Sequence, residues 1–178
     1  MANNYQQWSE MLHFNKDGDI KAQKAWVEEV LSCELDDDAE GTKKKLESLG
    51  VMVPYEDQAE YWPNFEWSIQ DVGIWVCSPE AGGIDEVCHL VQGFLKLFNP
   101  MGSWSLTWAE TCSKMRVGEF AGGAVFVTAN TIDFHSDTEW LNQKRKEHEK
   151  VLAHARELKK IGTSYGVRVS SRRKTKEA

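Results

Sequence analysis

Apolar residues at helical spacing dominate the first 50 positions of the chain. The segments Tyr5–Phe14 and Ile20–Leu31 both place apolar residues three or four positions apart, which predicts two helices. In the second segment, the residues expected to face inward are Ala22, Ala25, Trp26, Val27 and Val30. A third helix is expected from Ala39 to Leu49, because acidic residues precede it and a glycine follows it. Residues 1–60 are therefore predicted to form a helical N-terminal lobe.

The period of the pattern changes to two after Pro63. Phe65, Trp67 and Ile69 alternate with polar residues, and a short turn separates them from the apolar run Ile74–Cys77. This arrangement predicts a β-hairpin. The next segment, Ile84–Phe98, carries a single apolar stripe along about four helical turns and is the clearest helix of the chain.

A second hairpin is predicted after this helix. Trp104, Leu106 and Trp108 share one face of a strand, and the following strand, Gly123–Ala129, alternates less cleanly, which favours burial on both of its faces. Residues 131–138 are expected to be a loop. The order strand, strand, helix, strand, strand predicts an α+β fold in which a four-stranded antiparallel sheet (ββαββ) carries one amphipathic helix across a face.

The chain is thus divided into four predicted regions: the N-terminal lobe 1–60, the α+β core 61–138, a C-terminal helix 139–161 with a sparse apolar stripe, and a basic tail 162–178. The tail is too polar and too charged to be buried. The apolar stripe of the C-terminal helix suits packing at one edge of the fold.

Charge is unevenly distributed along the 178 residues, which carry a formal net charge of -7. Residues 28–60 hold eleven acidic residues against three lysines, whereas residues 144–178 hold twelve basic residues against four glutamates. An asymmetry of this size bears on binding partners and not on the fold. The eight tryptophans indicate that part of the aromatic surface lies at a contact with another molecule.

The four cysteines, Cys33, Cys77, Cys88 and Cys112, are widely spaced and include no C-x-x-C pair. The first twenty residues lack the pattern of a secretory signal, and no apolar run is long enough to cross a membrane. We therefore expect a cytoplasmic protein with reduced thiols, no membrane association, no metal and no cofactor.

The loop that joins the second pair of strands is the first candidate site. Glu110 continues the face of Trp108, and Lys114, Arg116 and Glu119 follow in the loop, where they could line a pocket for a charged small molecule, a nucleotide or a partner side chain. Two glycines at 122 and 123 would let a ligand approach the backbone. In the alternative interpretation the strand ends at Ala109, Glu110 is solvated and the glycines mark a turn.

The basic tail is the second candidate site. Its basic side chains could bind nucleic-acid phosphates with little sequence preference. These residues are Arg168, Arg172, Arg173, Lys174 and Lys176. The alternatives are a solvating terminus and a tail that folds back on the acidic segment 28–60. That acidic segment could itself occupy a basic groove on a partner protein.

Residues 65–134 resemble small uncharacterised proteins of bacteriophages and other mobile elements. The segments WSLTWAETCSK (104–114) and GEFAGGAVFVTA (118–129) carry the resemblance. It implies an accessory protein that acts on host machinery, and it assigns no site residue.

No nucleophile elbow, phosphate-binding loop or zinc-protease motif is present, and the five histidines are dispersed. The sequence therefore favours a non-enzymatic interaction protein that binds a host or phage protein and inhibits a host defence or nucleic-acid-processing complex. A small-molecule or nucleotide-binding protein, or an enzyme, that uses the 110–123 loop is the second hypothesis. Nucleic-acid binding through the tail is the third.

Overall fold

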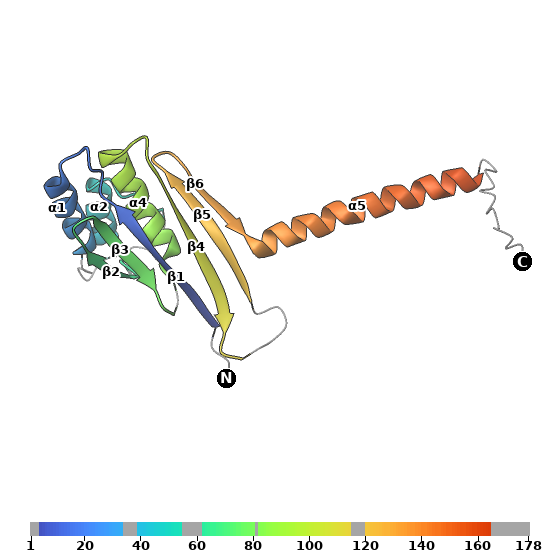
Figure 1. The fold of residues 1–178 in the computed structure, drawn as a ribbon, viewed down its shortest axis with the longest axis horizontal. Helices are drawn as coiled ribbons and strands as arrows, with labels where there is room; N and C mark the ends of the chain where they lie inside the picture. The colour runs from blue at the N-terminus through green and yellow to red at the C-terminus, as the bar shows by residue number, and fades with distance from the viewer. Residues whose placement is uncertain (1–3, 34–38, 55–61, 81, 115–119, 165–178) are drawn as a thin grey trace, which may run out of the picture. The chain divides into compact units, whose positions relative to one another are not determined.

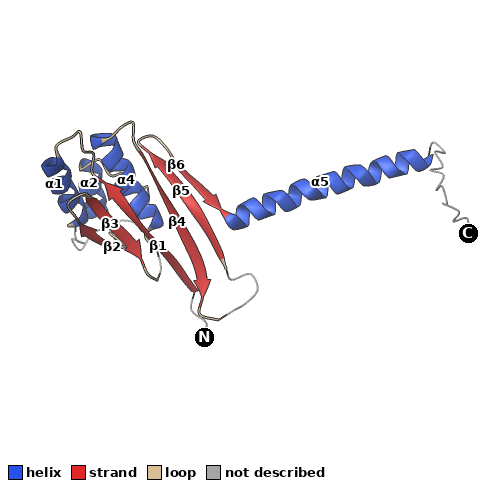
Figure 2. Ribbon diagram, viewed as in Figure 1, coloured by secondary structure: helices blue, strands red, loops and turns tan. Residues whose placement is uncertain are grey.

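Six strands form one antiparallel sheet in the order β2-β3-β1-β4-β5-β6 (Figures 1 and 2). The structure is a computed structural model that describes residues 4–33, 39–54, 62–80, 82–114 and 120–164. The strands are β1 (Asn4–His13), β2 (Glu66–Ile69), β3 (Gly73–Ser78), β4 (Ser103–Cys112), β5 (Ala121–Thr128) and β6 (Ile132–Ser136). The α+β class and the antiparallel pairing are confirmed, but the sheet has six strands and not the predicted four.

The central strand β1 is the segment that the sequence predicted as the first helix, so that prediction is wrong. Its buried apolar residues are Trp8 and Leu12, and Phe14 follows directly. A spacing of four residues fits one face of a helix and also one face of a strand. Strand pairing decides between them: Trp8 lies opposite Ser78 of β3, and Gln7 lies opposite Ala109 of β4. Through these pairings β1 joins the two predicted hairpins into one sheet.

The edge strand β6 lies where a loop was expected, so that prediction is also wrong. Ile132 pairs with Val127 of β5, and Phe134 pairs with Val125. An edge strand has only one neighbour, and the middle of β6 is exposed, which is why the alternation of polar and apolar residues is weak there. In β5, Val125 and Val127 are buried but Phe126 between them is 48% exposed, so β5 is buried on one face and not on both.

The two predicted hairpins are present in the structure. In the first, Trp67 of β2 lies opposite Val76 of β3. In the second, Leu106 of β4 lies opposite Val125 of β5. Trp104 and Leu106 are buried and Trp108 is half-buried, so these three residues share the core face of β4 as predicted.

In the part of the chain that the structure describes, three helices cover one face of the sheet (Figure 2). They are α1 (Ile20–Leu31), α2 (Ala39–Ser48) and α4 (Ile84–Phe98). The bounds of α4 are those predicted, and its apolar stripe is buried apart from the half-buried Phe98. Phe94 lies at the centre of an aromatic cluster, with ring centroids 6.3 Å from Phe14 and 6.1 Å from Trp26.

Helix α1 begins after Asp19, whose carboxylate accepts hydrogen bonds from the backbone N–H groups of Lys21 and Ala22. Its buried face consists of Gln23, Trp26, Val27, Val30 and Leu31. The predicted inward positions of Ala22 and Ala25 are wrong, because both residues are exposed. The fully buried Gln23 takes their place: its side chain accepts from Asn15 N at 2.8 Å and donates to Asn15 O at 2.9 Å.

Residues 1–137 form one compact unit, and residues 138–178 form a second unit. The segment 1–60 contains a strand as well as helices, and its buried residues belong to the same core as those of α4 and β4. The second unit contains most of α5 (Asp137–Ser164), the helix predicted from 139 to 161. Within the described ranges, no helix has both the length and the apolar character needed to cross a membrane.

Candidate functional site

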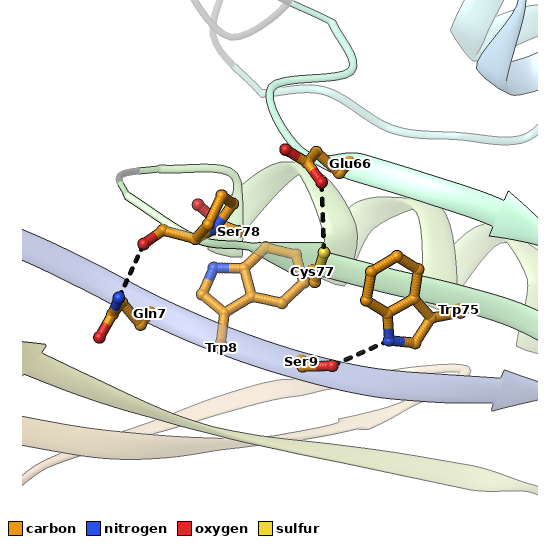
Figure 3. Close-up of a pocket in the computed structure, with 8 residues that line it drawn as sticks. Gln7, Trp8, Ser9, Glu66, Trp75, Cys77 and Ser78 are labelled. Atoms are coloured by element: carbon orange, nitrogen blue, oxygen red, sulfur yellow. Dashed lines mark hydrogen bonds between the residues drawn. The ribbon is translucent and has the colours of Figure 1, made fainter.

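A groove of about 510 Å³ lies over the neighbouring strands β1, β2 and β3 (Figure 3). Its lining residues are Gln7, Trp8, Ser9, Glu66, Trp75, Cys77, Ser78 and Pro79. Side chains alternate along a strand, so Trp75 and Cys77 point to the face opposite the core residues Ile74 and Val76. The registers place Glu66 opposite Cys77 and place Ser9 opposite Cys77 on the other side. The groove is therefore assembled by pairing between segments far apart in sequence.

The indole N–H groups of the groove are already bonded within the protein. Trp75 Nε1 donates to Ser9 Oγ at 2.9 Å, and Trp8 Nε1 donates to Gly82 O at 3.1 Å. Gln7 Nε2 donates to Pro79 O at 2.9 Å. These bonds fix the rings, so what the indoles still offer a ligand is their apolar surface and the negative face of the π-system.

Cys77 shares its face of β3 with Trp75 and lies beside the carboxylate of Glu66, whereas Trp8 belongs to the core face of the sheet (Figure 3). The thiol is 3.8 Å from Glu66 Oε2, and burial together with the neighbouring carboxylate raises the pKa of Cys77. A raised pKa keeps the thiol protonated at neutral pH, so Cys77 is not a reactive thiolate. Glu66 is the one ionisable carboxylate among the lining residues.

A second cavity, of about 430 Å³, lies at the first turn of α4. Its lining combines the aromatic pair Trp108 and Phe134, whose ring centroids are 6.4 Å apart, with two acidic side chains, Asp85 and Glu86. Gly83 precedes the helix with φ of 77°, and an added Cβ there would overlap the backbone of Asn64. The acidic side chains at this turn oppose the binding of an anion, which the N-terminus of a helix would otherwise attract.

The predicted loop site is only partly described by the structure. Glu110 is exposed, and its Oε1 accepts a hydrogen bond from Trp108 Nε1 at 3.3 Å. Lys114 is exposed as well. Arg116 and Glu119 lie outside the described residues, so an ion pair between Glu110 and Arg116 stays a prediction. Strand β4 continues to Cys112, so the alternative in which the strand ends at Ala109 is wrong, although Glu110 does face solvent.

The glycines of the loop site have a structural partner in Trp108. Gly123 lies opposite Trp108 in the β4–β5 register, and a Cβ at position 123 would overlap the indole ring. The approach to the backbone that the sequence suggested for a ligand is thus occupied at Gly123 by a side chain of the protein. The basic residues predicted to bind nucleic acid, from Arg168 to Lys176, lie beyond the described residues.

Helix α5 carries apolar side chains that are exposed to solvent. Their exposed fractions are Trp140 47%, Leu141 46%, Val151 64%, Leu152 41% and Leu158 55%. At 100° per residue these positions fall within a stripe about 120° wide, a width typical of a helix face that packs against another element. The predicted stripe is present, and its packing at one edge of the fold stays a prediction. We call these five residues the α5 stripe.

Two buried groups on α4 have altered ionisation. Burial raises the pKa of the Cys88 thiol to about 12, and the nearby carboxylates of Asp85 and Glu86 act in the same direction. Burial lowers the pKa of His89, whose Nδ1 is buried without a hydrogen-bond partner among the described residues. Within the same described part of the chain, no three His, Cys, Asp or Glu side chains come together as a possible metal site.

Sequence reasoning missed the groove of β1, β2 and β3. The one local signal was Trp75 and Cys77 on the solvent side of a strand whose other face is apolar. Comparisons with protein-family models, curated proteins and solved structures give no match to this chain.

Proposed function

We propose that this protein is a non-enzymatic interaction protein that binds a macromolecular partner, a host or phage protein, through the α5 stripe. The observation that carries the proposal is the exposure of five large apolar side chains on one face of a 28-residue helix. Most helices in proteins are stabilised by packing of an amphipathic face and not by helix propensity alone. A partner that covers the stripe would supply that packing.

The positions in the α5 stripe fit the mode in which an amphipathic helix lies in an apolar groove. Val151 and Leu158 are seven residues apart, and Leu141 and Leu152 are eleven residues apart, so each pair shares a row along the helix. Burial of one large apolar side chain contributes about 1.5–3 kcal/mol. Several such anchors are enough to offset part of the cost of association.

Charge supports the same proposal. Residues 138–178 hold twelve Lys or Arg against five Glu, whereas residues 1–137 hold nine Lys or Arg against 23 Asp or Glu. Two parts of opposite sign on one chain would steer an encounter with a partner that presents complementary charge. The narrower form of the proposal is an accessory protein of a phage or mobile element that inhibits a host defence or nucleic-acid-processing complex. It rests on this charge layout and on the resemblance of residues 65–134.

The test is affinity purification of the full chain from host lysate with two matched variants. Val151→Gln/Leu152→Gln changes the α5 stripe, and Lys146→Gln/Ala153→Gln places the same amide side chain on the opposite side of α5. We expect the wild type and the control variant to recover one partner in a stoichiometric amount and the stripe variant to recover at least tenfold less, with equal helicity by circular dichroism. Equal recovery by all three proteins, or no partner with the wild type, would refute the proposal.

Nucleic-acid binding is a second candidate, and the net positive charge of residues 138–178 favours it. A chain that lacks residues 168–178 should then lose a gel shift that weakens steeply with salt. An unchanged shift would exclude the tail as the binding element. A shift that persists without the tail and is lost on Arg156→Gln/Lys160→Gln would place the binding on α5.

A further inference from the structure

The geometry points to the groove of β1, β2 and β3 as a binding site for a small organic cation that carries a methylated ammonium group. The site is independent of α5 and of the proposed function. Its volume, about 510 Å³, lies within the range of about 300–1,000 Å³ that is usual for small-molecule sites. The volume of the groove therefore suits a small molecule. The side chains that line the groove determine which charge of ligand it binds.

The lining favours positive charge. Among the lining residues that the structure describes, Glu66 is the one charged side chain, and none of them is a lysine, an arginine or a histidine. The surrounding unit, residues 1–137, carries 23 acidic against nine basic residues, so its field also attracts cations. An anion would meet the Glu66 carboxylate, and none of the described lining residues carries a positive charge to offset it.

The aromatic rings favour an ammonium group with methyl substituents. Such a group is a bulky cation of low hydration, and it interacts with the negative face of an indole within about 6 Å of the ring centroid. Trp75 is half-buried and supplies that surface at the groove, while its N–H is engaged with Ser9 and is not available to an acceptor on a ligand. Trp8 is 5% exposed and contributes to the lining from below the sheet surface.

The arrangement of Trp75, Glu66 and Cys77 suits a cation that contacts an aromatic ring and a carboxylate at the same time. The Cys77 thiol is 3.8 Å from Glu66 Oε2 and shares its face of β3 with Trp75, so a cation placed over the thiol lies next to the carboxylate and on the side of the sheet that carries the Trp75 ring (Figure 3). Burial keeps the Cys77 thiol neutral, so it does not add a competing negative charge or a nucleophile. Ser78 and Pro79 close the side of the groove toward the end of β3.

The test compares choline with its neutral carbon isostere, 3,3-dimethyl-1-butanol, by isothermal titration calorimetry on the full chain. The two probes have the same shape and differ in charge. We expect saturable binding of choline, at least about tenfold tighter than binding of the neutral probe. Equal affinity for the two probes, or no binding of choline, would overturn the inference.

Substitutions in the groove test whether Glu66 and Trp75 are the residues that bind choline. Glu66→Gln and Trp75→Leu should each weaken choline binding by about fivefold or more, and Trp75→Phe, which keeps an aromatic ring, should weaken it less. Glu10→Gln and Trp67→Leu are the matched controls, since Glu10 and the 40% exposed Trp67 lie on the same strands but do not line the groove. Binding that is unaffected by Glu66→Gln and by Trp75→Leu, or weakened as much by the controls, would also overturn the inference.

Discussion

The indole ring of Trp108 lies against the backbone of Gly123 on the neighbouring strand. The two residues are direct partners in the β4–β5 register, and a side chain at position 123 would overlap the ring. A large aromatic ring across a strand glycine covers backbone that would otherwise be exposed and supplies the packing that the glycine lacks. The contact explains why a flexible residue is tolerated inside β5.

Gly123→Ala should destabilise the protein by about 1–3 kcal/mol, because the added methyl group overlaps the Trp108 ring and the backbone oxygen of His135 on β6. Chemical denaturation monitored by circular dichroism measures the change in the free energy of unfolding. Thr107→Ala, an exposed substitution on β4, should change it by less than about 0.5 kcal/mol. If Gly123→Ala and the wild type had equal free energies of unfolding, the packing of the Trp108 ring would not require a glycine at position 123.

Gln23→Leu should destabilise the protein by about 2–3 kcal/mol although it places an apolar residue in the core. The substitution leaves the part-buried N–H of Asn15 without its acceptor and removes one of the two donors to the Asn15 C=O, which keeps the bond from Gly18 N, and an unpaired polar group away from water is costly. Thermal and urea denaturation report the loss. Ala25→Leu, on the exposed face of the same helix, is the control and should be nearly neutral. A Gln23→Leu protein more stable than the wild type would contradict the claim that the hydrogen bonds between Gln23 and Asn15 stabilise the connection between β1 and α1.

Cys88 should make the protein sensitive to alkali. Its pKa rises on folding from an ordinary 9.0 to about 12, so the folded state holds the proton more tightly than the unfolded state. The stabilisation from this group is complete below pH 9 and is lost as the pH rises toward 12. Between pH 8 and pH 10.5 the loss from Cys88 alone should be about 2 kcal/mol.

The measurement is urea denaturation at several pH values for the wild type and for two variants, Cys88→Ala and Cys88→Ser. Neither replacement side chain ionises in this range, so both variants should show the same reduced loss despite their different packing. A loss as steep as that of the wild type in both variants would assign the alkaline sensitivity to other groups.

His89 should make the protein sensitive to acid. Burial lowers its pKa below the ordinary 6.5, so the unfolded state binds the proton more readily than the folded state. The stabilisation from this group is present above pH 6.5 and decreases as the pH falls through that value toward the lower pKa of the folded state. His89→Gln should flatten the decrease between pH 7 and pH 5, as measured by thermal denaturation. An unchanged slope in the variant would indicate that His89 titrates normally.

The elements that the sequence predicted correctly are those whose pattern is local and has one interpretation. The stripe of α4 runs the full length of the helix, and it occurs only at helical spacing. The two hairpins combine alternation with short connections. Trp8 and Leu12 of β1 fit two periods equally well, and their pairing partners lie more than 60 residues away. No local pattern distinguishes the two interpretations.

The candidate sites also differ in whether a local pattern or the pairing of distant strands defines them. The apolar stripe of α5, though not its exposure, could be read from the sequence, because an amphipathic helix defines its own faces. The groove could not, because Ser9, Glu66 and Trp75 come together only through the registers of β1, β2 and β3. The position of Glu110 was predicted through the alternation of β4, but its hydrogen bond to Trp108 depends on rotamers that the pattern does not specify.

The place of β1 in the sheet has a consequence for how the protein is made. Strand β1 is synthesised before both of the hairpins that it pairs with, and its second partner, β4, ends at Cys112. Contacts this distant in sequence slow folding, and until they form the unpaired edges of β1 are open to wrong pairing. Strand β1 therefore stays without its second neighbour until synthesis has passed Cys112, and during that interval its unpaired edge is exposed to aggregation.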